Sequence, residues 1–215
     1  MKKHFIILLV LITVDHAFAQ MGEDRKTHEK EIIYTGEGKI TLETGLVVEG
    51  KVTHSRLTQR KIRVDQGNGV NATYKLDEVK NFTLGDMFFE KILTPGIPIS
   101  RLDFALVLSN PNSSVRVYEV CWQEDIAIGA DAQAGVWPTN WEYYVLFPSM
   151  EQMKPPSHLA FTPFVKKVSK LVAGCPELQN KITNKEKGYS YGLISTAKDK
   201  LDVFINVANA YGSCK

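Results

Sequence analysis

Hydrophobic and polar residues alternate between residues 31 and 86. The apolar positions that follow this period of two are Ile32, Tyr34, Ile40, Leu42, Val48, Val52, Ile62 and Val64. Such alternation is typical of short strands with one buried and one solvated face. Thr44-Gly45 and the segment 66–69 (QGNG) favour tight turns between them, because Gly and Asn tolerate positive φ. The pattern predicts that residues 31–86 form an antiparallel meander, curled into a small β-barrel-like subdomain.

A second β-rich region covers residues 87–149. Strands are expected at 89–93, 102–108, 115–122 and 141–147, because these segments are rich in β-branched and aromatic residues. The segment 110–113 (NPNS) is typical of a turn. Residues 123–140 are expected to form a long loop, and a loop of that length usually serves a function or is mobile.

Apolar residues change to a helical period toward the C-terminus. Residues 150–160 are expected to form a proline-rich linker, and residues 161–215 a helical tail. One apolar stripe consists of Phe161, Phe164, Val165, Val168, Leu171 and Val172, and another of Ile194, Ala197, Leu201, Phe204, Ile205 and Ala208. A short helix is expected between them, from Pro176 to Ile182. Striped helices need a partner surface, so the predicted fold class is α+β, with the helices packed on the sheet.

The first nineteen residues have the pattern of a cleavable export signal. Lys2 and Lys3 precede an apolar run at 5–14 that only Thr13 interrupts, and Ala17-Phe18-Ala19 follows with small residues where a signal peptidase cleaves. The run is shorter than the roughly 20 residues that span a bilayer. A buried helix or an uncleaved anchor is the alternative to cleavage. Residues 1–19 are therefore predicted to be a signal peptide and residues 20–30 a flexible lead, in a protein that is periplasmic, on the outer surface or secreted.

The charge of the mature chain is close to neutral. Removing residues 1–19 leaves 26 − 2 = 24 basic and 24 − 1 = 23 acidic residues, a net charge of +1. This balance makes no electrostatic case for nucleic acid or for an anionic membrane surface. No later segment is apolar enough to predict a transmembrane helix after cleavage.

The chain has three cysteines, Cys121, Cys175 and Cys214. An odd number allows one intramolecular bridge at most, and export would supply an oxidising compartment. If the helices that end near Cys175 and Cys214 pack antiparallel, these two sulfurs can form a disulfide; two free thiols are the alternative. Cys121 lies in the strand expected at 115–122 and is predicted to be a small core residue.

The order of several motifs resembles a set of exported Bacteroidota proteins without an assigned activity. The matching motifs are Gly38-Lys-Ile-Thr-Leu-Glu-Thr-Gly45, Val115-Arg-Val-Tyr-Glu119 and Cys175-Pro-Glu-Leu178, with Asn209-Ala-Tyr211 before Cys214. The resemblance spans most of the mature chain and implies a barrel-like N-terminal half and a helical C-P-E-L tail. It implies a compartment and an architecture, but no reaction.

Aromatic residues in and beside the 123–140 loop are the candidate binding residues. Trp122, Trp137 and Trp141 could form a platform for a glycan or a peptide. Cross-strand packing inside the sheet is the alternative for those on strands.

Three acids in the same loop, Glu124, Asp125 and Asp131, are the candidates for catalysis in an exported hydrolase that acts on a glycan or peptide. A solvated loop is the simpler interpretation. No spacing typical of a metal site, a nucleophile with its histidine or a phosphate loop is present, so no metal or cofactor is expected. The sequence favours a non-enzymatic binding or structural module of the cell envelope, with the hydrolase as the alternative.

Overall fold

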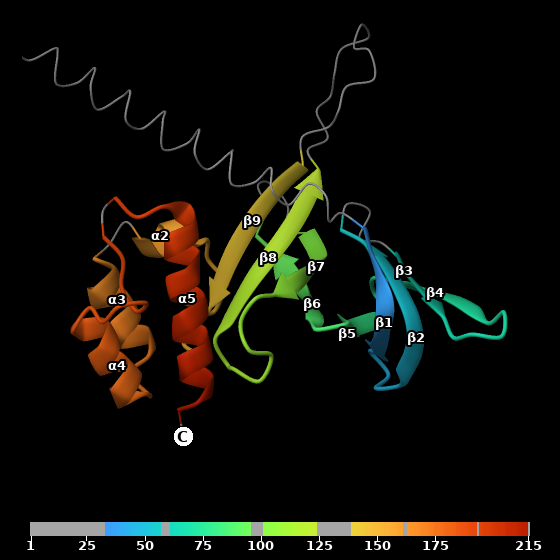
Figure 1. Cartoon of the computed structure of the whole chain (residues 1–215), viewed down its shortest axis with the longest axis horizontal. Coiled ribbons are helices and arrows are strands. Elements are labelled where there is room, and N and C mark those ends of the chain that lie inside the picture. Colours follow the sequence, from blue (N-terminus) through green and yellow to red (C-terminus); the bar gives the residue numbers. More distant parts are fainter. Residues whose placement is uncertain are drawn as a thin grey trace, which may run out of the picture. The chain divides into compact units, whose positions relative to one another are not determined.

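The chain folds as an α+β protein in a computed structural model that describes residues 33–56, 61–95, 101–123, 139–160, 163–192 and 194–214. Among these residues, nine strands come first and four helices follow (Figure 1). The strands are β1 (Ile33–Leu42), β2 (Val47–Ser55), β3 (Lys61–Asp65), β4 (Asn71–Lys75), β5 (Val79–Leu84), β6 (Met87–Thr94), β7 (Arg101–Val107), β8 (Arg116–Gln123) and β9 (Thr139–Leu146). The helices are α2 (Pro156–Ala160), α3 (Phe164–Leu171), α4 (Pro176–Thr183) and α5 (Ala197–Gly212).

All nine strands belong to one antiparallel sheet, in the order β4-β3-β2-β1-β5-β6-β7-β8-β9. The expected barrel is wrong, because this sheet is open. Strand β5 does pair with β1, as closure of a small barrel would require. Its other edge, however, pairs with β6 and not with β4, so β4 remains at one edge of the sheet and β9 at the other.

The turns predicted from glycine and asparagine are confirmed. Gly67, Asn68 and Gly69 all have positive φ, and they connect β3 to β4. The backbone of Gln66 donates to Val70 across this turn. A different constraint acts on Gly38 of β1, where an added Cβ would lie 2.1 Å from the carbonyl oxygen of Thr83. Only glycine therefore allows β5 to approach β1 this closely.

The sheet bends so that its N-terminal strands pack on its middle strands. Phe82 of β5 and Phe89 of β6 stack with their ring centroids 4.6 Å apart. His54 of β2 lies 5.9 Å from Phe104 of β7, although three strands (β1, β5 and β6) separate β2 from β7 in the sheet order. Buried aliphatic residues of β1 to β3 complete this core, among them Ile40, Val52 and Ile62.

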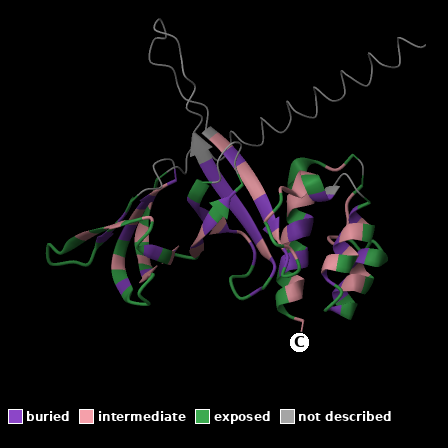
Figure 2. Ribbon diagram, turned by 180° about the vertical axis from the view of Figure 1, so that it is seen from behind, coloured by how far each residue is buried: buried purple, intermediate pink, exposed green. Residues whose placement is uncertain are grey.

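The helices cover one end of the β8–β9 pair and form a second core with it. Val117 of β8 and Val145 of β9 pack there with Val168 of α3, Leu178 of α4 and Phe204 of α5. Buried residues are concentrated on these strands and on the facing sides of the helices (Figure 2). The alternating strands and the striped helices thus meet as the sequence predicts.

Two details of the helical tail differ from the prediction. The segment expected to be a linker contains the short helix α2, whose Leu159 is fully buried. Ile194, expected on the last apolar stripe, precedes α5 and is 99% exposed. The cause is a capping box, in which the Thr196 hydroxyl accepts from the Asp199 amide and the Asp199 carboxylate accepts from the Thr196 amide. This pair of hydrogen bonds fixes the start of α5 after Ile194.

Within the residues that the structure describes, no helix combines the length and the apolar character needed to cross a bilayer.

Candidate functional site

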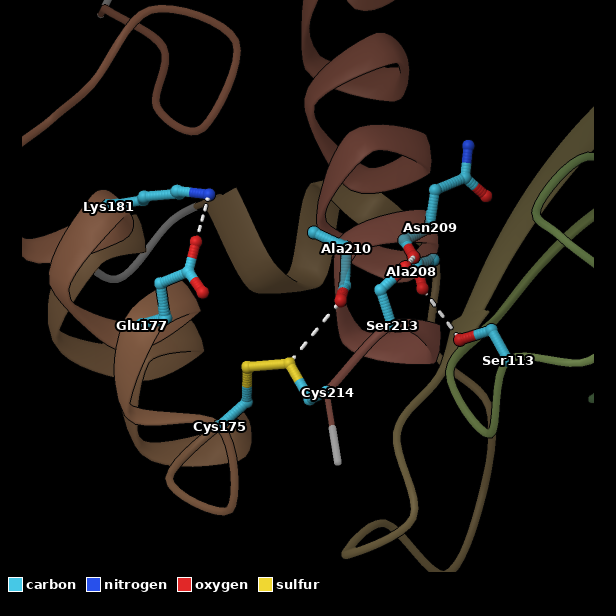
Figure 3. Close-up of a disulfide and its surroundings, with 9 residues drawn as sticks. All are labelled: Ser113, Cys175, Glu177, Lys181, Ala208, Asn209, Ala210, Ser213 and Cys214. Carbon is cyan, nitrogen blue, oxygen red and sulfur yellow. Dashed lines mark hydrogen bonds and ion pairs between the residues drawn. A yellow bond between two sulfur atoms is a disulfide. The ribbon is translucent and has the colours of Figure 1, made fainter.

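A disulfide joins Cys175 to Cys214, as the sequence predicts. Cys175 is the N-cap residue of α4, and Cys214 lies just beyond α5, with a Cα–Cα distance of 5.7 Å. Figure 3 shows the bridge spanning the start of α4 and the end of α5. The bridge therefore fixes the two helices to each other at this end of the helical layer.

The end of α5 is also tied to the sheet. Ser113, in the turn before β8, donates from its hydroxyl to the carbonyl oxygen of Ala208 at 2.6 Å (Figure 3). The Asn209 side chain accepts from the backbone amide of Asn110 at 2.7 Å. The end of α5 is thus held by the disulfide to α4 and by these hydrogen bonds to the turn before β8.

A recess of about 390 Å³ lies beside the disulfide, between α4 and α5. Leu178 and Ala210 supply apolar walls, and Ser213 supplies a hydroxyl. Tyr189, from the segment that joins the two helices, supplies an aromatic ring. A recess that combines apolar walls with a few polar groups is the usual form of a small binding site.

One ion pair sets the charge of the recess. Lys181 Nζ lies 2.6 Å from Glu177 Oε1, one helical turn away on α4 (Figure 3). The hydrogen bond from Lys181 and its charge hold the pKa of Glu177 below its usual value, and the hydrogen bond to Glu177 raises the pKa of Lys181. The same ammonium lies 5.6 Å from the centroid of the Tyr189 ring. Both groups are therefore charged at neutral pH, each paired with the other.

A second polar cluster is buried where β2 meets the β8–β9 pair. Arg56 donates from Nη1 to the Glu119 carboxylate at 2.7 Å and from Nη2 to the Glu119 carbonyl oxygen at 3.1 Å. Its guanidinium also lies 4.4 Å from the centroid of the Trp141 ring. Arg56 and Glu119 are 1% and 4% exposed, so the pair lies in the interior. It joins strands that are far apart in the sheet and therefore helps to maintain the bend.

His54 lies on β2, two residues before Arg56, among phenylalanine rings. Its ring centroid is 5.0 Å from that of Phe82 and 5.4 Å from that of Phe89. Neither ring nitrogen has a hydrogen-bond partner in the described part of the chain. Burial, together with the charge of Arg56, lowers the pKa of His54 from 6.5 to about 3. The imidazole is therefore neutral in the folded protein over the physiological pH range.

This lowered pKa predicts a loss of stability in mild acid. Below pH 6.5 the unfolded chain binds a proton at His54 and the folded chain does not, down to about pH 3. Stability should then fall by about 1.4 kcal/mol per pH unit within this window. The His54→Phe variant should show a smaller slope between pH 6.5 and 5 in urea unfolding, whereas variant His158→Gln, on an exposed residue of α2, should keep it. An unchanged slope in His54→Phe would contradict the assignment.

The three tryptophans of the predicted platform differ in their location. Trp141 is 1% exposed and stacks on Arg56, so it faces the interior of the protein. Trp122 lies in β8 opposite Asn140 of β9. Trp137 lies outside the described residues, as do Glu124, Asp125 and Asp131. A platform at Trp122 and Trp137, and a catalytic role for the three acids, stay predictions.

Cys121 is a buried thiol of β8, as predicted for a core residue. Burial raises the pKa of its thiol to about 11. The sulfur is therefore protonated at neutral pH and is a poor nucleophile.

Sequence reasoning missed the buried ion pair and, apart from Cys175 and Cys214, the residues that line the recess. The i,i+4 spacing of Glu177 and Lys181 is a signal that could have identified their pairing on α4. Arg56 lies just after β2 and Glu119 lies on β8, 63 residues apart, and no sequence pattern connects them. In the part of the chain that the structure describes, no group of three or more His, Cys, Asp or Glu side chains is placed to hold a metal ion.

The fold defines the protein as an α+β protein, with an open nine-stranded meander and a disulfide-linked helical layer. Comparisons with protein families, curated proteins and solved structures found no match. The resemblance to exported Bacteroidota proteins stays a prediction.

Proposed function

We propose that the mature chain is an exported, non-enzymatic binding module of the cell envelope, which holds a short peptide segment in the recess between α4 and α5. The recess beside the Cys175–Cys214 disulfide carries this proposal. Its walls come from two helices that are fixed to each other by the disulfide. A rigid site loses little conformational entropy when a ligand binds.

The charged groups of the recess favour binding over catalysis. A general acid or base works best with a pKa near the operating pH. The shifts at Glu177 and Lys181 go the other way, because each group stabilises the charged form of the other. The pair can exchange its mutual contact for contacts with the charged groups of a ligand.

The same groups favour a peptide over a glycan. Sugar rings bind by stacking on an open aromatic face, and the Lys181 ammonium lies over the ring of Tyr189. A peptide offers its own carboxylate and ammonium groups to Lys181 and Glu177. It can also place an apolar side chain against Ala210.

The disulfide is consistent with an oxidising compartment outside the cytoplasm. Together with the predicted signal peptide, it supports the proposal of export. Periplasm, outer surface and medium are all compatible with it.

Titration of ¹⁵N-labelled protein with mixtures of short peptides would test the proposal. We expect amide shifts confined to the lining of the recess, at Leu178, Tyr189, Ala210 and Ser213. Binding should weaken about tenfold in Lys181→Gln, since a hydrogen bond to a charged group contributes about 1.5–3 kcal/mol. The matched control is Lys80→Gln, an exposed lysine of β5.

Two results would contradict the proposal. One is an absence of shifts in the recess at millimolar peptide. The other is cleavage of the peptides during the titration, seen by mass spectrometry, which would favour the exported hydrolase.

A further inference from the structure

Charge is distributed unevenly between the sheet and the helical part of the chain. Residues 33–149 contain 11 basic and 14 acidic residues, a net charge of −3. Residues 150–215 contain 10 lysines and 5 acidic residues, a net charge of +5. The near-neutral total of the mature chain therefore conceals a basic helical layer.

Most of these lysines are not neutralised by acids of the same layer. Among the nine lysines of the described part of 150–214, only Lys181 has an ion-pair partner among the described residues. Lys166 on α3 and Lys198 on α5 are exposed, and Lys200 on α5 is half-buried. The acids nearest in sequence are Asp199 and Asp202, and the Asp199 carboxylate is engaged in the cap of α5.

Several of the lysines gather at one end of the layer. Tyr191 connects the starts of two helices there. The centroid of the Tyr191 ring lies 4.5 Å from that of Phe164 on α3. Lys200 Nζ on α5 lies 5.9 Å from the centroid of the same Tyr191 ring. The disulfide lies at the opposite end of α5. The first turns of α3 and α5, with Lys166, Lys167, Lys198 and Lys200, therefore lie near Tyr191, at the end of α5 away from the disulfide.

The same end has a solvent-exposed aliphatic side chain. Ile194 immediately precedes the cap of α5 and is 99% exposed, the highest value among the exposed large hydrophobic residues of the structure. Thr196 to Asp199, shortly after it, are exposed as well, whereas Ser195 is half-buried. Solvation of an isoleucine costs free energy, which contact with an apolar phase would recover.

We propose that this end of the helical layer, defined by Lys166, Lys167, Lys198, Lys200 and Ile194, binds the surface of an anionic membrane. The lysines would lie at the level of the lipid headgroups, and the Ile194 side chain would enter the boundary between headgroups and acyl chains. Charge complementarity selects an anionic partner. Ile194 selects a membrane over a soluble polyanion, because a soluble polyanion offers no apolar phase.

This surface is separate from the recess and does not depend on a peptide ligand. The Cys175–Cys214 bridge keeps α4 and α5 together at the other end. Loss of membrane binding would therefore leave the proposed peptide site intact, and loss of peptide binding would leave the membrane surface intact.

Co-sedimentation of the mature protein with vesicles would test the proposal. We expect binding to phosphatidylcholine vesicles that contain 30% phosphatidylglycerol and not to pure phosphatidylcholine vesicles. The triple variant Lys166→Gln/Lys198→Gln/Lys200→Gln should bind on the order of 100-fold more weakly at low salt, from about one factor of five per lysine. The variant Ile194→Ser should bind about tenfold more weakly, since it removes the inserted apolar side chain.

The matched control is Lys51→Gln/Lys61→Gln/Lys80→Gln, which removes three exposed lysines of the sheet. It should bind like the unmodified protein. Far-ultraviolet circular dichroism would check that each variant is folded. Equal binding to neutral vesicles, or equal losses in the helical and sheet triple variants, would overturn the proposal. Binding to a soluble sulfated polysaccharide without binding to vesicles would overturn it as well.

Discussion

Replacing Glu119 by leucine is expected to lower the free energy of unfolding by about 3–5 kcal/mol. The variant leaves Arg56, which is 1% exposed, without the carboxylate that accepts its hydrogen bond at 2.7 Å. A buried charge without its partner is strongly unfavourable, because the interior cannot replace the water that solvates a guanidinium in the unfolded chain. Urea unfolding, followed by circular dichroism at neutral pH, would measure the loss.

Two further variants separate the buried charge from a general effect of substitution. In the double variant Arg56→Met/Glu119→Leu, most of the stability should return, because both charges are removed together. The exposed pair Lys39–Glu49 is the surface control, and Glu49→Gln should change stability by less than about 1 kcal/mol. If Glu119→Leu were as stable as the unmodified protein, Arg56 would have to be solvated, and the bend of the sheet would not depend on this pair.

Removing the disulfide should have the next largest effect. The variant Cys175→Ser/Cys214→Ser should lose about 2–4 kcal/mol, because the bridge closes a loop between residues separated by 39 positions and restricts the unfolded chain. The fold itself should persist. Val203, Phe204, Val207 and Ala208 remain buried on α5 and hold it against the sheet.

Reduction offers an independent test of the same bridge. Dithiothreitol should destabilise the unmodified protein by a similar amount and have no further effect on the double variant. Amide exchange in reduced protein should increase most between Ala210 and Cys214, where the chain loses its covalent attachment. Equal stability with and without the reductant would show that the bridge contributes nothing to folding.

Local patterns predicted most of the fold. Alternation at residues such as Ile62 and Val64 gave the strands, and glycine and asparagine at 66–69 gave the turn between β3 and β4. The bend and the open edge were not predictable in this way. Whether β5 pairs with β4 or with β6 depends on which edge is occupied in three dimensions, and both arrangements satisfy the same local pattern.

The candidate site was predicted only in part. The disulfide followed from two helical stripes that place Cys175 and Cys214 at neighbouring helix ends. The recess depends on Tyr189, in a connecting segment without periodicity, and on the position of α5 over α4. Trp141 is buried against Arg56, which reaches it from the turn just after β2. Contacts between residues so far apart in the chain cannot be predicted from the local patterns of a single sequence.

The net charge of the whole chain did not predict the local charge of the helical segment. The whole-chain balance argued against an anionic surface as partner, yet the helical segment alone carries a net charge of +5. Opposite contributions from the sheet and the helices cancel in the sum. Electrostatic attraction acts over about 8–10 Å at physiological ionic strength, so the local distribution decides binding.

Peptide mapping of the protein purified from the envelope or medium of its own cells would test the central claim most directly. The account predicts that the chain begins at Gln20, and that digestion without reductant yields a single peptide pair joined through Cys175 and Cys214. A chain that begins at Met1, with both cysteines open to alkylation and the protein recovered from the cytosol, would contradict export and the proposed envelope function together.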